Sequence, residues 1–271
     1  MRSFTNLAFA LSLAGPLLAG DGASAETLRL AGTGGAMPMA EQVAAGFLAA
    51  TGINIEILPG LGSKGAIAAT ADGVIDLAVS TRLLTPEEAA IGLTVIPFAR
   101  TALVFITSHA KPNSLKSTEL VGIFRSTNPK WADGSPLNII LRTKFDGDTL
   151  ILEELFPGIQ DAIEAARTRP EIPVAPTDQD NATLAEHIPG SFVQAGFSQI
   201  VTEKRNLRFV PIDGVEPTPE NFETGKYPYE KIFYLVYPAK GKAAAERLLD
   251  FLRSAKGQDI LRETGNLPVP G

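Results

Sequence analysis

A regular alternation of short apolar strands with helical segments between residues 27 and 80 constrains the fold more than any other feature of the sequence. The first helical segment stops at Gly52, a residue suited to a helix C-cap. The order strand, helix, strand, helix, strand favours a parallel sheet with helices on its faces. The expected segments are a strand at 27–35, a helix at 39–52, a strand at 53–60, a helix at 63–73 and a strand at 74–80.

A long extended stretch, residues 94–108, separates this unit from a second one. Because it exceeds the usual length of one strand, we interpret it as two extended segments that pass between two lobes. After the second unit, a crossover near residues 225–236 leads back to two closing helices. The elements expected in between are helices at 117–126, from Thr149, at 158–169 and at 180–188, with strands at 137–142, 190–196 and 231–238.

These elements predict an α/β protein of two lobes, with mixed sheets flanked by helices and two crossover strands. We expect residues 26–95 to form the first part of lobe 1, residues 96–224 to form lobe 2, and residues 225–271 to return to lobe 1. Ligands of open α/β sheets bind at the carboxyl ends of strands, so the cleft between the lobes is the expected binding site.

Residues 1–25 have the pattern of a cleavable signal peptide. Arg2 precedes a short apolar run, and Ala23 and Ala25 provide the small residues of a cleavage site. The sequence therefore predicts export to the periplasm, with Glu26 as the first mature residue. An uncleaved membrane anchor is the alternative, which Pro16 and the shortness of the apolar run disfavour.

The composition argues against several classes of site. The chain has no cysteine and only 2 histidines, so we expect neither disulfides nor a metal or other cofactor. The formal net charge is −6 and the basic residues are scattered, so no nucleic-acid partner is expected. Ser108 and Lys111 have the spacing of a serine nucleophile and a lysine base, but the accompanying motifs are absent. We predict a protein that is not an enzyme, with hydrolysis dependent on Ser63 as the alternative.

Loops at strand ends are the candidate binding elements. Most are rich in Gly, Ser or Thr, which lets backbone N–H groups and hydroxyls point at an anion beside a helix N-terminus. Arg82 and Arg142 could add bidentate hydrogen bonds to phosphate, sulfate or carboxylate. Taken singly, each loop is equally an ordinary connection, with Ser63 or Thr81 as a helix cap. The loops are residues 32–35, 62–65, 80–82 and 142–149.

Several stretches, taken in order, are similar to those of a known family. They are "GLGSKGAIAATADGVIDLAVSTRLLTPEE", "ELVGIF", Arg142 with Gly147, "IPGSFVQAG" and "TGKYPYEKIFYLVYP". The chain resembles the phosphate-binding proteins that serve phosphate ABC transporters, over nearly the whole mature length. The resemblance implies the two-lobed type II periplasmic-binding-protein fold, a small oxyanion as ligand and an inner-membrane ABC permease as partner.

The resemblance also implies where the ligand binds. Three departures accompany it. The Ser-Gly-Thr at the end of the family's arginine loop is Asp146-Gly147-Asp148 here, the family's aspartate after the serine at position 80 is Thr81, and its threonine after the first glycine loop is Ala36. Carried over by position, together with Arg82 and the two aspartates, the candidate ligand residues are Thr33, Gly34, Ser63, Ser80, Thr81, Arg82, Arg142, Asp146, Gly147 and Asp148.

Asp146 and Asp148 conflict with a bound dianion, because two unit charges 4 Å apart interact by about 4 kcal/mol at an effective dielectric of about 20. Three interpretations stay open. One aspartate could accept a hydrogen bond from a protonated oxyanion while the other caps a helix. The carboxylates could instead neutralise Arg142 and Arg82, leaving a site for a neutral, zwitterionic or cationic ligand. A calcium site is the third interpretation.

The leading hypothesis is a monomeric periplasmic solute-binding protein that closes on phosphate or a related oxyanion and delivers it to the permease. The alternative is a sensor or scaffold with the same fold, or a binder of a non-phosphate ligand.

Overall fold

The computed structural model of the chain describes residues 27–269. The expected signal peptide, its cleavage site and residues 270–271 lie outside this range. Among the residues described, no helix is both long enough and apolar enough to cross a bilayer.

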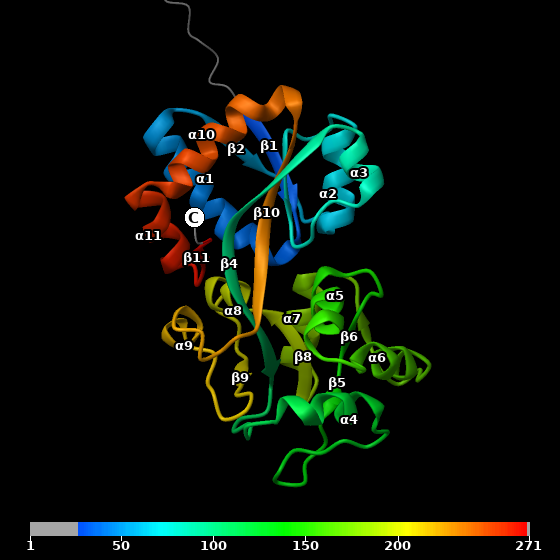
Figure 1. Cartoon of the computed structure of the whole chain (residues 1–271). Coiled ribbons are helices and arrows are strands. Elements are labelled where there is room, and N and C mark those ends of the chain that lie inside the picture. Colours follow the sequence, from blue (N-terminus) through cyan, green and yellow to red (C-terminus); the bar gives the residue numbers. More distant parts are fainter. Residues whose placement is uncertain (1–26, 270–271) are drawn as a thin grey trace, which may run out of the picture.

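Lobe 1, the upper lobe in Figure 1, begins with the predicted alternation of strands and helices. Strand β1 lies between β2 and β3 and is parallel to both, which confirms the predicted parallel sheet. Helix α1 ends at Gly52, whose φ of 75° suits glycine, so the predicted C-cap is confirmed. The elements are β1 (Thr27–Gly32), α1 (Met37–Thr51), β2 (Asn54–Ile57), α2 (Gly62–Ala71), β3 (Leu77–Ser80) and α3 (Pro86–Ala90).

Two long strands join the lobes: β4 (Leu93–Thr107) and, antiparallel to it, β10 (Glu230–Pro238) (Figure 1). The sequence predicted two extended segments in place of β4, whereas the structure has one strand of 15 residues. Pro97 has no N–H to donate to the ladder between β4 and β10. The register of the two strands shifts next to this residue, and their pairing continues beyond it.

Lobe 2, the lower lobe in Figure 1, holds most of the remaining elements. The predicted strand at 137–142 is divided into two, because β5 pairs with β8 whereas β6 pairs with β7. Two helices begin earlier than predicted, α5 at Gly147 and α7 at Asp178. The elements are α4 (Leu120–Arg125), β5 (Asn138–Ile139), β6 (Leu141–Arg142), α5 (Gly147–Leu155), α6 (Ile159–Arg167), β7 (Val174–Ala175), α7 (Asp178–His187), β8 (Ser191–Gly196), α8 (Phe197–Thr202), β9 (Arg208–Val210) and α9 (Pro219–Glu223).

The chain then returns to lobe 1 through β10, and the two predicted closing helices are present. They are α10 (Lys242–Arg253) and α11 (Ala255–Glu263), followed by β11 (Leu267–Pro268). One sheet runs through both lobes in the order β2-β1-β3-β10-β4-β8-β5, and β9 and β11 also pair with β4. Separate hydrophobic clusters fill the two lobes. The boundaries expected at residues 95 and 224 stay predictions.

Candidate functional site

The loop after β1, in lobe 1, carries hydrogen-bond donors of the kind that bind an anion. The Thr33 hydroxyl donates a hydrogen bond of 3.1 Å, and the backbone N–H of Gly35 one of 2.8 Å, to the same oxygen, Oδ2 of Asp178. A Cβ on Gly34 would lie 2.5 Å from Gln179 Oε1 and 3.0 Å from Asp178 Oδ2, so a side chain here would displace these two groups of α7. We refer to Thr33, Gly34 and Gly35 as the cradle.

Asp178 comes from the other lobe, as the first residue of α7. Thr177 caps that helix by accepting a hydrogen bond from the N–H of Asp180, which fixes where the helix starts. The second oxygen of Asp178, Oδ1, accepts a hydrogen bond of 3.3 Å from Arg142 Nη2. The buried carboxylate of Asp178 therefore receives donors from both lobes at once. A carboxylate is an oxyanion, so the cleft holds one of the chain's own oxyanions.

Arg142 ends β6 and is 2% exposed. A guanidinium has five N–H donors, and each of those of Arg142 has an acceptor within the protein. Nε and one Nη2 donor bind the two oxygens of Asp146 at 3.2 and 2.6 Å, and the other Nη2 donor binds Asp178. Nη1 donates to the carbonyl oxygens of Ala175 and Thr177. Arg142 has no donor left for a ligand unless a carboxylate moves away.

Asp146 has two structural roles. Its carboxylate binds Arg142 in a bidentate arrangement, and its Oδ1 accepts a hydrogen bond of 3.0 Å from the N–H of Asp148. Asp146 is therefore the N-cap of α5, and the interpretation in which one of the two aspartates caps a helix is confirmed. The interpretation in which they neutralise arginine holds for Arg142, whereas Arg82 is neutralised by Glu88.

Asp148 pairs with a lysine that the sequence did not single out. Its Oδ1 forms an ion pair with Lys231 of β10, and both side chains are almost fully buried. Lys231 lies beside the cradle, because a Cβ on Gly35 would be 3.6 Å from both Lys231 Nζ and Asp178 Cγ. The other oxygen of Asp148 is buried with no hydrogen-bond partner among residues 27–269. The ion pairs form two groups, Arg142 with Asp146 and Asp178, and Lys231 with Asp148. The hydrogen bond from the Asp148 N–H to Asp146 and the attraction between Lys231 and Asp178 join these five residues into one ionic cluster at the centre of the site.

In this cluster the carboxylates outnumber the cations, and the pKa values follow from that imbalance. Burial raises the pKa of Asp146. The negative charge of Asp148 raises this pKa further, to about 6, although Arg142 opposes both effects. Burial also favours a raised pKa for Asp178, but Lys231, Arg142 and the donors of the cradle hold it below its ordinary value. Burial favours a lower pKa for Lys231, but Asp148 and Asp178 raise it. Asp178 therefore stays charged, and Asp146 takes up a proton as the pH falls through about 6.

The other predicted residues of lobe 1 bind one another. Ser63 Oγ accepts a hydrogen bond of 3.0 Å from the N–H of Thr81 and lies 3.2 Å from its hydroxyl, so Ser63 joins α2 to the end of β3 and does not cap α2. The Ser80 hydroxyl donates to the carbonyl of Arg82 at 2.8 Å. Arg82 binds both oxygens of Glu88 at 2.7 Å. Gly147 of lobe 2 faces this group, since a Cβ there would collide with the Thr81 hydroxyl.

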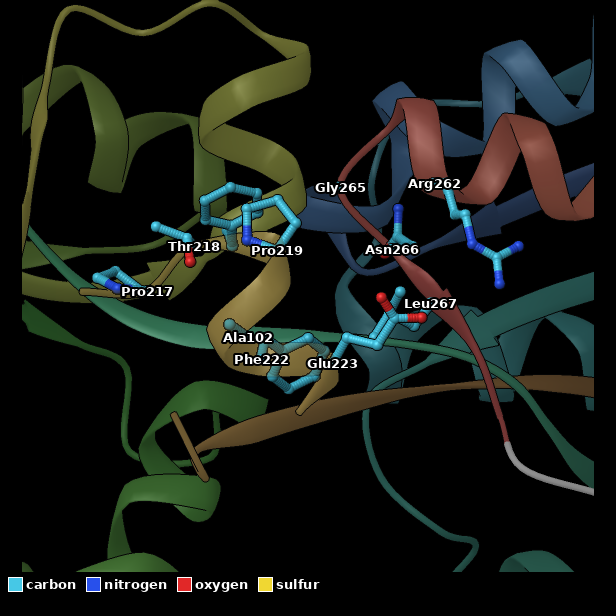
Figure 2. A pocket seen from close by; sticks show the side chains of 11 residues that line it. Ala102, Pro217, Thr218, Pro219, Phe222, Glu223, Arg262, Gly265, Asn266 and Leu267 are labelled. Atoms are coloured by element: carbon cyan, nitrogen blue, oxygen red, sulfur yellow. The ribbon is translucent and has the colours of Figure 1, made fainter. Parts of the chain in front are cut away.

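A pocket of about 260 Å³ opens where these loops meet. Five of the ten predicted ligand residues line it, namely Thr33, Ser63, Arg82, Asp146 and Gly147. Another hollow of about 110 Å³ lies between α9, the segment after α11 and β4 (Figure 2). Its walls include Phe222, Pro219 and Leu267 and none of the predicted ligand residues, and Glu223 and Arg262 are its only charged lining residues. We place the candidate site in the first pocket, and the site includes the ionic cluster, whose Asp146 lines that pocket.

The remaining candidates from the sequence have structural partners. Among residues 27–269, no group of three or more His, Cys, Asp or Glu side chains could hold a metal ion, so nothing in that range favours the calcium interpretation. The Ser108 hydroxyl donates a hydrogen bond of 2.6 Å to the carbonyl of Ile188.

Sequence reasoning missed Asp178 and Lys231, and each had a signal. Thr177 with Asp180 three residues later is a capping pattern that places Asp178 in the first turn of a helix. Lys231 is in phase with Phe233 and Leu235 on the buried face of β10, where an isolated charge indicates a partner.

The chain was compared with known proteins. The family model described as the PBP superfamily domain matches residues 19–256. The phosphate-binding protein PstS of Borreliella burgdorferi is 27% identical over 206 residues, which are 72% of this chain and 73% of that protein.

Solved structures resemble the fold over most of its length. A Clostridium perfringens protein assigned as a phosphate ABC transporter substrate-binding protein, solved with bound phosphate, superposes with a TM-score of 0.78 at 21% identity, covering 90% of this chain and 100% of that one. An ABC-type phosphate transport receptor from Vibrio cholerae gives a TM-score of 0.63 at 17% identity, covering 90% and 100%. The predicted two-lobed fold is confirmed.

Proposed function

The chain belongs to the PBP superfamily, and from this premise we propose that it is a periplasmic solute-binding protein that captures phosphate or a related small oxyanion. Its partner would be an inner-membrane ABC permease, which receives the ligand. The proposal includes a monomeric protein that binds its ligand and does not transform it. The names of the relatives, which are phosphate-binding proteins and phosphate transport receptors, support the choice of ligand.

One observation within the chain carries the proposal. The Thr33 hydroxyl, the Gly35 N–H and Arg142 converge from two lobes on a single carboxylate, that of Asp178. Hydroxyls, backbone N–H groups at a helix start and a guanidinium are the donors that suit oxyanions. An arrangement that holds one oxyanion with these donors is suited to hold another.

The mechanism follows from the two crossover strands. β4 and β10 are the long strands that join the lobes, so they are the expected hinge (Figure 1). An oxyanion bound by donors of both lobes favours the closed state. The shift in the equilibrium equals the difference between its binding free energies in the closed and the open state. Lys64 and Lys144 line the pocket and would attract an anion to it, whereas Arg82 is already paired with Glu88.

Isothermal titration of the mature protein with phosphate, sulfate, molybdate and glutamate tests the proposal. We expect heat with at least one tetrahedral oxyanion. Thr33→Val should weaken that binding by at least about tenfold, because a hydrogen bond to a charged group contributes roughly 1.5 kcal/mol or more. Thr224→Val, an exposed threonine at the end of α9, is the matched control and should leave binding unchanged. An absence of heat with every oxyanion would refute the proposal.

A further inference from the structure

The donors that the cleft would offer an anion are bound to carboxylates of the chain itself. The Thr33 hydroxyl and the Gly35 N–H bind Asp178, and the five donors of Arg142 are divided among Asp146, Asp178 and two carbonyl oxygens. An incoming oxyanion therefore meets no free donor on these groups. It must exchange with an acceptor that is already in place.

Asp178 is the acceptor that blocks the cradle. It does not line the pocket, which ends at Thr33 and Asp146, so a ligand in the pocket reaches the donors of Thr33 and Gly35 only when Asp178 withdraws. Asp146, by contrast, is the N-cap of α5 and belongs to the same short segment as Arg142, so it stays near Arg142 whether the cleft is open or closed.

The same contact links the lobes. Asp178 belongs to α7 of lobe 2 and the cradle belongs to lobe 1. The neighbouring Gln179 strengthens the link by donating a hydrogen bond of 3.0 Å to the carbonyl of Gly34. Separation of the start of α7 from lobe 1, which is a movement in the direction of opening, therefore withdraws Asp178 from the cradle.

We propose that Asp178 is an intramolecular competitor that occupies the oxyanion cradle, latches the two lobes together and admits only ligands that bind the cradle better than a carboxylate does. This inference rests on the proposed function, since it concerns the same site. An external carboxylate would replace Asp178 without a new hydrogen bond and would lose translational freedom on binding. A tetrahedral oxyanion has more acceptor oxygens and more charge, so it can gain from the exchange. Asp178 is thus a specificity-determining residue that favours tetrahedral oxyanions over carboxylates.

The competition has a measurable consequence. A tethered group has a high effective concentration at its own site, and the apparent affinity for a ligand is reduced by the fraction of molecules in which the site is free. Removal of the competitor should therefore tighten the binding of phosphate and also admit simple carboxylates.

Titration of phosphate and acetate into the parent, Asp178→Ala and Asp180→Asn tests this. Asp180 is the matched control, because it is exposed in the first turn of the same helix and contacts Thr177 rather than the cradle. We expect Asp178→Ala to bind phosphate at least about tenfold tighter than the parent and to bind acetate, which the parent does not. Asp180→Asn should behave as the parent does. Asp178→Asn, which keeps the size of the side chain, serves if Asp178→Ala does not fold.

Spin labels report the latch independently of affinity. The chain has no cysteine, so Ala89→Cys on α3 and Glu154→Cys on α5, both exposed, would introduce its only thiols. Without added phosphate, we expect the distance between the labels to be longer or more broadly distributed in Asp178→Ala than in the parent, and to shorten when phosphate is added.

The outcomes separate the two proposals. If the parent binds phosphate and Asp178→Ala binds it no tighter, or if Asp180→Asn gives the same gain, the competitor is refuted and the proposed function stands. An unchanged distance distribution in Asp178→Ala refutes the latch. If Asp178→Ala binds phosphate and the parent does not, the competitor is supported and phosphate capture by the parent is refuted. If no variant binds any oxyanion, both proposals fail.

Discussion

The two halves of the cleft are built from different chemistry. The lobe 1 half presents mainly neutral donors, namely the hydroxyls and backbone of the cradle and of Ser63 and Thr81. Its charged lining residues are Lys64, which is exposed, and Arg82, which is paired with Glu88. The lobe 2 half carries charges, with Arg142, Asp146, Asp148 and Asp178 within one ion-pair cluster that Lys231 completes from β10. The donors of the neutral half are uncharged hydroxyl and N–H groups, so they can bind oxyanions that differ in charge.

The charged half has a different role. Its cations are already paired and a carboxylate is in excess, so a further anion is accepted only with a movement of Asp178 or the uptake of a proton. The neutral half therefore supplies binding, whereas the charged half determines which anion binds and under which conditions. The following predictions test this division.

Removal of the lysine from the charged cluster should have the largest effect. Lys231→Met leaves Asp148 buried without its cation, and the loss of one partner of a buried ion pair costs about 3–5 kcal/mol. Chemical denaturation should show this loss in the free energy of unfolding. Lys242→Met is the matched control, because its pair with Glu246 is exposed and should contribute roughly 0–1 kcal/mol.

A double variant identifies the cause of that loss. Lys231→Met with Asp148→Asn removes the unpaired charge and should recover a large part of the lost stability. If Lys231→Met costs no more than Lys242→Met, the cluster is not a buried charge network and the contrast between the two halves is wrong.

The acidity of Asp146 should have the next largest effect. Its pKa is raised from 3.8 to about 6, so the folded protein keeps this proton to a higher pH than the unfolded chain does. The unfolded state then binds fewer protons between pH about 4 and 6, and the contribution of Asp146 to stability falls as the pH rises through this window. The fall should be about 2–3 kcal/mol, because one pKa unit corresponds to about 1.4 kcal/mol.

The lowered pKa of Asp178 acts in the opposite direction, but below the ordinary pKa of an aspartate, so the two windows are separate. The free energy of unfolding should be measured from pH 4 to 7 for the parent, for Asp146→Asn and for the exposed control Asp259→Asn. The decline attributed to Asp146 is the difference between the parent and Asp146→Asn. A difference that does not change with pH would contradict a raised pKa.

The sequence identified residues in both halves, including Arg142, Asp146 and Asp148, but it missed Asp178 and Lys231 for a physical reason. Gly-rich loops at strand ends are local features, and the alternation of strands and helices brings such loops to one edge of a sheet. The position of Asp178 depends on the packing of α7 against a loop 145 residues earlier in the chain. Its role was missed because the helix was expected to start at Asp180, two residues too late.

The same distinction applies to the fold. The parallel order of β1, β2 and β3 follows from local periodicity and was predicted. The continuity of β4 was not, because the length of the segment favoured two pieces, and the pairing with β10 that continues past Pro97 joins distant parts of the chain. A helix cap by one of Asp146 and Asp148 was correctly proposed, since a cap depends only on the residues next to it, and the structure identifies the cap as Asp146.

The smallest effect is expected for Arg82, the one charged residue that the neutral half offers among the predicted ligand residues. Its guanidinium binds Glu88 in a bidentate arrangement and lowers the pKa of that glutamate, so we expect Arg82 to stabilise the start of α3 and not to bind the ligand. Arg82→Met should cost about 0.5–1 kcal/mol of stability in chemical denaturation, the value of a partly exposed ion pair at the surface, and should change the Kd for phosphate by no more than about twofold. Arg253→Met, at an exposed pair with Asp250, is the matched control. A loss of tenfold or more in phosphate affinity for Arg82→Met alone would mean that lobe 1 also contributes a charge to the ligand, and the division between a neutral and a charged half would not hold.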